Sequence, residues 1–334
     1  MAPTTPGKAR GLARISDGEG RYAMLAIDQR AQLLPLVTRA VGTTGPAASA
    51  ALGDVKRLLA ETLSGHVTGL LVDPTYGYHR VVPVLPRSVG LLLTLEDHRV
   101  ETTPAGFRIS RLIPDWSVAA ALRAGAEALK LLVFYHPDAP PAVARAQQGL
   151  VREVGDACAA SDRPFVLELL PYPLPGQSPD EYADALPRLS VAIAQAFSDP
   201  GYGADLYKLA LPGTPAHVRE WGGARYSLAD LVEVMREITR LLPAPWVLLS
   251  GGMPGDRFVE ALRAALAAGA RGYLAGRAVW WQPLAAYPDL RRVAHALAAD
   301  GVGVLAALNR VLAALPPAAV EAQWRLPVAA DGPV

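Results

Sequence analysis

The sequence is poor in cysteine, long apolar runs and lysine. The first two shortages argue against a disulfide within the chain and against a membrane-spanning helix, and the third makes the few lysine positions informative. Cys158 is the only cysteine among 334 residues, so no disulfide can form within the chain, and a reducing compartment is expected. No uninterrupted apolar run reaches the roughly 18 residues that a membrane-spanning helix needs. The first twenty residues also lack the apolar segment of a signal peptide. We therefore expect a soluble, cytoplasmic protein.

The sequence also lacks an excess of charge of either sign. The formal net charge is +1 at pH 7, and acidic and basic residues are interspersed along the chain. Without a basic patch, neither nucleic acid nor an anionic membrane surface would be attracted electrostatically, so neither is an expected partner. The hydrophobic fraction of 51% predicts instead a sizeable apolar core.

Eight short β-prone runs alternate with longer stretches of helical character. The runs occupy residues 22–28, 67–73, 90–96, 128–135, 164–172, 205–212, 245–252 and 272–277. They are almost continuously apolar, which is typical of parallel strands covered on both faces. Eight such strands with intervening helices predict an α/β fold, the (β/α)8 TIM barrel. The alternative, an open dinucleotide-binding sheet, would carry GxGxxG where this chain has "DQRAQLL".

The segments between the runs support this organisation. Residues 178–197 begin with a serine followed by early acidic residues, as the N-terminus of a helix prefers. Residues 255–272 carry an apolar stripe at helical spacing and stop at a glycine. Residues 74–89 are rich in proline and predict a short turn. We expect one domain over residues 1–334, with its core at about 20–315 and a flexible C-terminal tail.

The scarcity of lysine makes two of its positions informative. Only four of the 32 basic residues are lysine, yet Lys130 stands in the apolar run "EALKLLVFYH" and Lys208 in "ADLYKLALPG". Burying an ammonium group is costly. Unlike arginine, however, a buried lysine can lose its proton and become a nucleophile. Both are therefore candidate catalytic residues, although either could instead pair with a carboxylate of the barrel in a purely structural role.

Further polar side chains stand near the C-terminal ends of the runs, where the active sites of such barrels lie. Glu168, in "VLELL", could act as a general base on a substrate hydroxyl or pair with Lys208. Asp28 is followed at once by Gln29 and Arg30, which favours a place in the site for all three. Asp73 precedes a proline, and we interpret it as a turn residue.

The last two runs end in segments suited to an anion. Ser250, Gly251 and Gly252 follow the seventh run, and Gly276 and Arg277 follow the eighth. In phosphate-binding barrels these two loops hold the phosphate. Glycine lets backbone N–H groups approach a ligand closely, and arginine can add a two-pronged contact.

The histidines give no sign of a metal site. The six are His66, His79, His98, His136, His217 and His295, and they form no HxxxH pair or similar cluster. A nucleophilic lysine needs no metal, so we expect neither a metal nor a cofactor.

Taken together, the motifs resemble class I tagatose 1,6-bisphosphate aldolase and its relative, sulfofructose-phosphate aldolase. They run in the same order from about residue 20 to 281 and include "YAMLAIDQR", "LLVDPTYG", "PFVLELLPY", "DLYKLALP", "LLSGG" and "AGRAVW". The resemblance implies a TIM barrel that cleaves a ketose 1-phosphate to dihydroxyacetone phosphate and an aldehyde. It also implies a homo-oligomer.

The resemblance implies a role for each candidate residue. Lys208 would form the Schiff base, Glu168 would transfer protons, and Lys130 and Asp28 would support them. The phosphate on C1 would be held by Ser250, Gly251, Gly276 and Arg277. Gln29 and Arg30 would lie near the far end of the substrate, where a second phosphate or a sulfonate binds.

Three functions stay open at this point. "DPTYG" and "FSDP" favour the tagatose branch, whereas "DLYK" and "LAGRAVW" favour the sulfosugar branch. We favour tagatose 1,6-bisphosphate as the substrate, with sulfofructose phosphate as the alternative. A phosphosugar-binding barrel without turnover is the third possibility, and the presence of both Lys208 and Glu168 counts against it.

Overall fold

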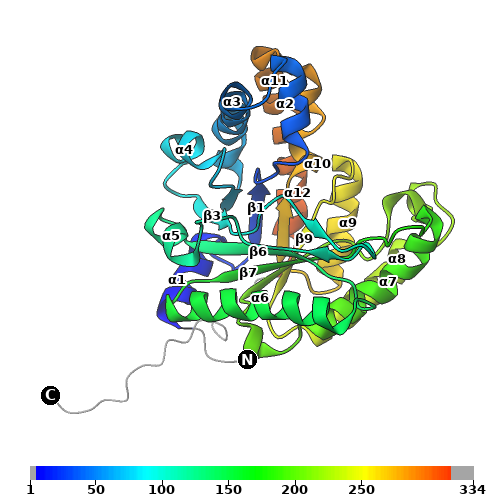
Figure 1. Cartoon of the computed structure of the whole chain (residues 1–334). Helices are drawn as coiled ribbons and strands as arrows, with labels where there is room; N and C mark the ends of the chain where they lie inside the picture. The colour runs from blue at the N-terminus through cyan, green and yellow to red at the C-terminus, as the bar shows by residue number, and fades with distance from the viewer. Residues whose placement is uncertain (1–4, 317–334) are drawn as a thin grey trace, which may run out of the picture.

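The computed structural model describes residues 5–316, and its centre is a closed barrel of eight parallel strands (Figure 1). The strands are β1 (Tyr22–Ala26), β2 (Gly69–Val72), β3 (Gly90–Thr94), β6 (Ala128–Phe134), β7 (Phe165–Leu170), β8 (Leu206–Leu209), β9 (Trp246–Leu249) and β10 (Gly272–Ala275). They follow one another in chain order, and β10 closes the barrel against β1, where Tyr22 pairs with Gly272. The predicted TIM barrel is confirmed, with each strand inside its predicted run.

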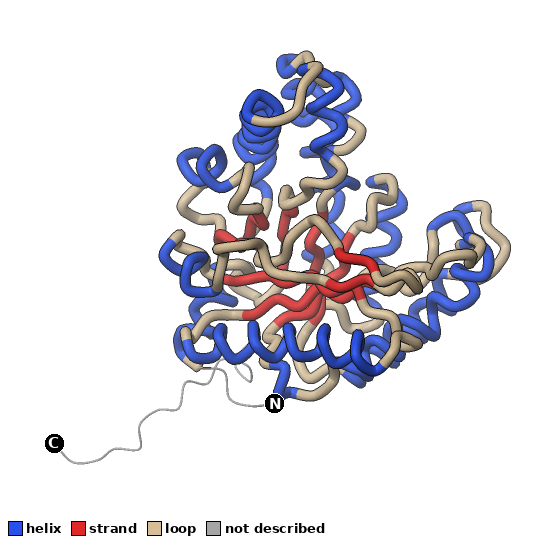
Figure 2. Tube along the Cα trace, viewed as in Figure 1, coloured by secondary structure: helices blue, strands red, loops and turns tan. Residues whose placement is uncertain are grey.

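Helices surround the strands, as Figure 2 shows. The longer ones are α3 (Pro46–Leu63), α6 (Pro141–Ala160), α7 (Pro179–Ala196), α8 (Leu228–Leu241), α9 (Gly255–Ala267) and α12 (Val302–Ala313). The shorter ones are α1 (Pro6–Arg14), α2 (Leu33–Val41), α4 (Tyr78–Val81), α5 (Val118–Arg123), α10 (Arg277–Trp280) and α11 (Leu290–Ala296). The predicted start of α7 is confirmed, because the Ser178 hydroxyl accepts from the N–H of Glu181 in a capping box.

Side chains alternate along each strand between the barrel interior and the helical shell. In β1, Met24 belongs to an inner cluster, whereas Ala23 and Leu25 belong to the larger core shared with the helices. Leu12 of α1 and Ile15 just after it belong to the inner cluster, so the first helix packs against the N-terminal end of the barrel. Burial on both faces explains why the strands read as continuous apolar runs.

Two connections depart from a simple strand–helix alternation. Between β2 and β3 the chain forms only α4 and a 3₁₀ turn, in agreement with the short turn predicted there. Between β3 and β6 it forms a small antiparallel pair, β4 (Glu101–Thr102) and β5 (Arg108–Ile109), which was not predicted. Two-residue strands are too short to show an alternating pattern. The tail predicted to be flexible lies, from residue 317 on, outside the described residues.

The stretch Leu290–Ala313, made of α11, a π-helical turn and α12, is long and apolar enough to cross a membrane by length and composition alone. Within the described residues it is the one helix that meets this test. Val293, Leu297, Leu305 and Leu308 are nevertheless buried in the core, and α12 contacts α9 and α10. Packing in the helical shell therefore accounts for many of its apolar side chains.

Candidate active site

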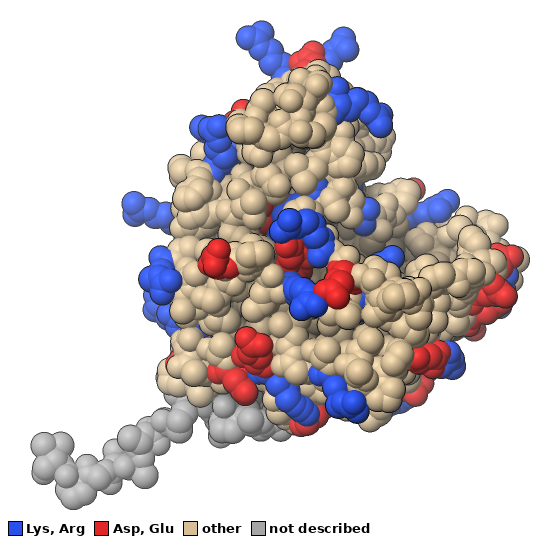
Figure 3. All heavy atoms as spheres, viewed as in Figure 1, with Lys and Arg blue, Asp and Glu red and all other residues tan. Residues whose placement is uncertain are grey.

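A cavity of about 450 Å³ lies at the C-terminal end of the barrel. All eleven residues predicted for the site line it: Asp28, Gln29, Arg30, Lys130, Glu168, Lys208, Ser250, Gly251, Gly252, Gly276 and Arg277. The structure thus brings together residues from strands far apart in the sequence, while the role of each remains a prediction. Figure 3 shows acidic and basic atoms next to one another near the middle of one face, without a broad patch of one sign.

The two-residue alternation of side chains along a β-strand explains why Lys130, Glu168 and Lys208 point into the barrel. Lys130, Glu168 and Lys208 stand on the neighbouring strands β6, β7 and β8, and Glu168 pairs in register with Lys208. Each stands two residues after a member of the apolar inner cluster and therefore points inward as well. The cavity floor is the layer directly above that cluster.

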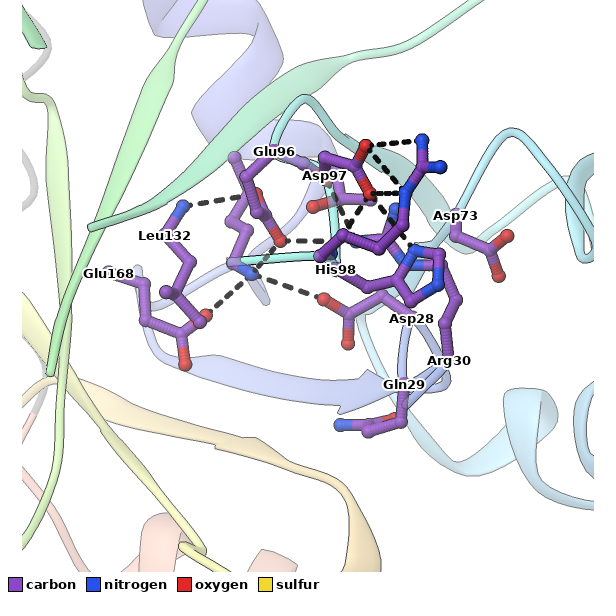
Figure 4. Close-up of polar contacts among 12 residues, drawn as sticks. Asp28, Gln29, Arg30, Asp73, Glu96, Asp97, His98, Leu132 and Glu168 are labelled. Carbon is purple, nitrogen blue, oxygen red and sulfur yellow. Dashed lines mark hydrogen bonds and ion pairs between the residues drawn. The ribbon is translucent and has the colours of Figure 1, made fainter. Parts of the chain in front are cut away.

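Lys130 is the centre of a carboxylate cage. Its Nζ lies 2.7 Å from Glu96 Oε1, 2.7 Å from Glu168 Oε2 and 3.1 Å from Asp28 Oδ2, and its side chain is 1% exposed. In Figure 4 the three labelled carboxylates turn toward this common centre. Burial alone would lower the pKa of Lys130, but the charges of the three carboxylates outweigh it and raise this pKa. Lys130 is thus an ammonium at neutral pH.

Lys208 is held much less tightly. Its Nζ donates to Glu168 Oε2 at 2.9 Å, and this is its only hydrogen bond or ion pair among residues 5–316. The same carboxylate oxygen contacts Lys130, so the two amines share one acceptor. Lys208 Nζ therefore has hydrogen-bonding capacity left for a ligand in the cavity that it lines.

Asp28 completes the cage from the end of β1. Burial alone would raise its pKa, but the positive charges of Lys130, Lys208 and Arg30 lower it below its usual value. Asp28 is therefore an anion throughout the neutral range. Asp73, by contrast, does not line this cavity: its Oδ2 accepts from the N–H of Tyr76 at 2.7 Å, which confirms its predicted turn role.

Glu96 is the residue that sequence reasoning missed. It follows β3, its Oε1 contacts Lys130, and its Oε2 accepts from the N–H of Leu132 at 3.0 Å. The available signal was its place at the very end of the predicted run 90–96, which matches the place of Asp28 in the first run. Asp97 and His98, which come next, also line the cavity.

Arg30 and Gln29 leave polar atoms without a partner. Arg30 is buried, and its Nη2 donates to the main-chain oxygen of Glu96 at 2.9 Å. Its Nε and Nη1, and Oε1 of Gln29, have no hydrogen-bond partner within the described part of the chain. Buried polar groups are nearly always hydrogen-bonded. This end of the cavity therefore calls for a ligand with both an anionic and a hydroxyl group, or for solvent.

The loops after β9 and β10 form a second wall, in which Gly276 lies next to Gln29. Gly251 and Gly252 have φ angles of +57° and +90°, which side chains other than glycine rarely adopt. The N–H of Gly276 donates to the Ser250 hydroxyl at 3.3 Å, and Arg277 Nη2 donates to the main-chain oxygen of Gly251 at 3.3 Å. This wall thus brings N–H groups, a hydroxyl and a guanidinium together without a carboxylate of its own.

A model of the family described as DeoC/LacD family aldolase matches residues 22–282. The tagatose 1,6-diphosphate aldolase of Lactococcus lactis subsp. lactis is 30% identical over 282 residues, which cover 83% of this chain and 85% of that protein. The enzyme of the same name from Streptococcus agalactiae serotype V is 32% identical over 282 residues, covering 83% and 86%. Tagatose 1,6-diphosphate aldolase 2 of Enterococcus faecalis is 30% identical over 322 residues, covering 94% and 96%.

Solved structures share the fold at lower identity. A fructose-bisphosphate aldolase from Plasmodium falciparum superposes with a TM-score of 0.67 at 13% identity, covering 93% of this chain and 97% of that one. An archaeal fructose 1,6-bisphosphate aldolase gives a TM-score of 0.58 at 17% identity, covering 91% and 98%. At these identities the likeness establishes the barrel architecture alone.

Proposed function

Since this chain belongs to the DeoC/LacD family of aldolases, it is a lyase, and we propose that it cleaves a ketose 1-phosphate through a Schiff base on Lys208. The resemblance noted in the sequence is confirmed at the level of the family. The proposed products are dihydroxyacetone phosphate and a three-carbon aldehyde phosphate. Family membership alone does not identify the nucleophile, the proton carrier or the substrate.

The contrast between the two cavity lysines carries the choice of nucleophile. Lys130 is saturated by three carboxylates, whereas Lys208 has a single partner. An amine that attacks a carbonyl needs a free lone pair and room for the new bond. Among the described residues, Lys208 Nζ makes one polar contact, to Glu168 Oε2, and it lines the cavity, so it has room for that bond.

Glu168 is placed to carry protons for Lys208. In the proposed reaction the Lys208 amine adds to the C2 carbonyl, and loss of water gives a protonated Schiff base. Glu168 takes the proton of the C4 hydroxyl, and C4 becomes the aldehyde carbon as the C3–C4 bond breaks. The electron pair of that bond forms the C2=C3 double bond of the enamine. The aldehyde leaves, C3 takes a proton, and water hydrolyses the Schiff base to release dihydroxyacetone phosphate and the free amine.

The wall after β9 and β10 is the proposed site of the phosphate on C1. Its N–H groups, the Ser250 hydroxyl and the Arg277 guanidinium suit a dianion, and no carboxylate of that wall opposes it. With C1 held there, C2 would face Lys208 on the adjacent β8.

The unpartnered atoms of Arg30 and Gln29 support a second anionic group at C6. Two guanidinium nitrogens of Arg30 with free N–H groups suit a phosphate, and the free amide oxygen of Gln29 suits a substrate hydroxyl. We propose tagatose 1,6-bisphosphate as the substrate, since relatives named for it match most of this chain. A sulfonate would satisfy the same donors, and a comparison of kcat/KM on tagatose 1,6-bisphosphate and sulfofructose phosphate decides between them.

Reductive trapping tests the nucleophile. Borohydride added with dihydroxyacetone phosphate should leave a stable adduct on the peptide that contains Lys208, and mass spectrometry should locate it on that side chain. The same treatment without dihydroxyacetone phosphate is the control. An adduct on Lys130, or none at all, contradicts the mechanism. Activity in excess EDTA is expected to persist, because no step of this mechanism uses a metal ion.

A further inference from the structure

A third lysine is buried outside the cavity. Lys56 of α3 is 0% exposed and lies behind the segment that carries Asp28 and Gln29. Its Nζ donates to the main-chain oxygen of Ile27 at 2.6 Å and to that of Gln29 at 2.9 Å, and it forms an ion pair with Asp73. All three ammonium donors are therefore used.

The geometry around Lys56 exceeds what charge balance requires. Burial lowers the pKa of Lys56, while the charge of Asp73 opposes this, so the ammonium is costly to keep in place. One carboxylate would neutralise it. Two of its three hydrogen bonds go instead to the carbonyl groups immediately before and after Asp28. A buried ammonium needs acceptors for all three donors, and here the two besides Asp73 are the carbonyl groups on either side of Asp28, so satisfying Lys56 also fixes the backbone around Asp28.

Asp28 depends on such support because the strand no longer holds it. β1 ends at Ala26, and the last hydrogen bond to the neighbouring strand runs from the N–H of Ile27 to the main-chain oxygen of Leu71 at 2.9 Å. The Asp28 carboxylate must still stay 3.1 Å from Lys130 Nζ. Asp73, at the end of β2, is fixed by its own turn and anchors Lys56 from the other side. Figure 4 shows Asp28, Gln29 and Asp73 at this corner of the site.

We propose that Lys56 is a positioning residue, which holds the two carbonyl groups around Asp28 so that this carboxylate keeps the Lys130 ammonium in the carboxylate cage. This inference rests on the proposed function. Its physical basis is that small displacements of a supporting group can cost about 100-fold in rate without removing any reacting atom.

Three variants separate positioning from mere charge balance. Lys56→Met leaves the Asp73 carboxylate buried and unpaired, so it should lower Tm. In Lys56→Met/Asp73→Asn the charge is removed while the amide oxygen can still accept from Tyr76, so most of the Tm should return. Asp73→Asn alone removes the carboxylate partner but keeps the Lys56 ammonium, which can still donate to the two backbone carbonyl groups. The activity assay is exchange of the C3 proton of dihydroxyacetone phosphate in deuterated water, followed by NMR, because it needs no knowledge of the C6 group.

The expected pattern is a kcat about 10- to 100-fold lower in both variants that lack Lys56, with KM changed less than about threefold. Asp73→Asn should lower Tm and should reduce kcat less than either variant that lacks Lys56, because the ammonium can still donate to both carbonyl groups. The proposal is overturned if the double variant recovers wild-type kcat together with Tm, or if Asp73→Asn loses as much kcat as the double variant.

A matched pair at the opposite end of the barrel provides the control. Lys8 Nζ lies 2.8 Å from Asp205 Oδ2, and Asp205 Oδ2 accepts from the N–H of Phe165 at 2.8 Å, much as Asp73 accepts from Tyr76. Lys8→Met/Asp205→Asn should lower Tm and leave kcat unchanged; an equal loss of kcat here would contradict a positioning role specific to Lys56. If the wild-type protein neither exchanges the C3 proton of dihydroxyacetone phosphate nor forms the borohydride-trapped adduct on Lys208, the proposed function is wrong, and the positioning role that rests on it is wrong as well.

Discussion

The two walls of the cavity offer a substrate different chemical groups: charged side chains on one and mainly main-chain N–H groups on the other. The charged arc, from β1 to β8, consists of Asp28, Arg30, Glu96, Lys130, Glu168 and Lys208. The amide arc, after β9 and β10, consists of Ser250, Gly251, Gly252, Gly276 and Arg277. Members of the charged arc are linked to one another by ion pairs, whereas the amide arc presents main-chain N–H groups shaped by two glycines with positive φ. A network of exchangeable protons suits chemistry, and fixed N–H groups suit the retention of an anion.

The formal charges of the charged arc favour a cation at Lys208 once substrate has reacted. Asp28, Glu96 and Glu168 count as three negative charges, and Lys130 and Arg30 as two positive ones. With a neutral amine at Lys208 the arc is therefore short of one positive charge. A protonated Schiff base supplies that charge at the atom 2.9 Å from Glu168. The amide arc has no comparable deficit, so a bond-breaking role there has no electrostatic support.

The strongest test of this division is Lys208→Met. Without the amine the charged arc cannot form an iminium, so kcat should fall by at least about 10⁴-fold. Because the amide arc is untouched, inorganic phosphate, which cannot react with the amine, should still bind, with a Kd within about threefold of wild type by calorimetry. Lys8→Met, far from the cavity, is the control for a generic loss of lysine. Substantial turnover in Lys208→Met would show that the two arcs do not divide chemistry from binding.

Lys130→Met should have the next largest effect. It leaves three carboxylates facing Arg30 and Lys208, and kcat should fall about 10²- to 10³-fold, with a lower Tm. The raised pKa of Lys130 means that its stabilisation is present below its unfolded pKa of about 10.4 and is lost only at higher pH. Between about pH 6 and 9 the wild-type Tm should therefore show no midpoint from this residue.

Lys130→Met/Glu96→Gln shows whether that loss is one of folding or of chemistry. Removing one carboxylate should restore part of Tm, since fewer unpaired negative charges remain buried. It should not restore kcat, because no ammonium remains beside Glu168 and Lys208. Recovery of both quantities would mean that Lys130 serves stability alone.

The sequence predicts the architecture and the eleven lining residues because both follow from local pattern. Lys130, Glu168 and Lys208 stand out since each interrupts an apolar run at an inward position. Glu96 does not interrupt its run; it ends it, and a charged residue at the end of a strand looks ordinary. Which carboxylate pairs with which amine depends on neighbouring strands, and no pattern within one strand contains that information.

Lys56 shows the same limit more sharply. It stands in an amphipathic helix, where a lysine is normally a solvated surface residue. Its burial arises because the helix passes behind the ends of β1 and β2, where the carbonyl groups of Ile27 and Gln29 and the carboxylate of Asp73 accept hydrogen bonds from its ammonium. That crossing is a property of the packed barrel. The helix sequence alone does not specify it.

On the amide arc, Arg277→Met should act on binding rather than on turnover. Loss of the guanidinium should raise KM for the ketose phosphate about 10- to 30-fold, with kcat within about threefold, because a charge-assisted contact to phosphate is absent in ground and transition states alike. Inhibition by inorganic phosphate should weaken in parallel. The exposed Arg291, far along the chain on α11, provides the control as Arg291→Met. A fall in kcat equal to the rise in KM would place Arg277 in the chemical step instead.

The smallest effect is expected from His98, which lines the same cavity but is not a member of the charged arc. Burial and the nearby charge of Arg30 lower the pKa of His98, so its ring is neutral at pH 7. Since the folded chain disfavours the protonated ring, its contribution to stability is lost as the pH falls below the unfolded value of about 6.5. His98→Gln should therefore reduce the drop in Tm between about pH 7 and 5.

Substrate should reverse that preference if an anion sits at Arg30. A phosphate at C6 would favour the protonated ring, so the ratio of KM in His98→Gln to KM in wild type should rise about two- to threefold as the pH falls from about 7 to 5.5. Taking the ratio at each pH cancels the titration of the substrate itself. His295, on α11, is the control as His295→Gln and should leave the ratio flat. A ratio independent of pH for His98→Gln would place the second anion away from Arg30, and the charged arc would then serve the chemistry alone.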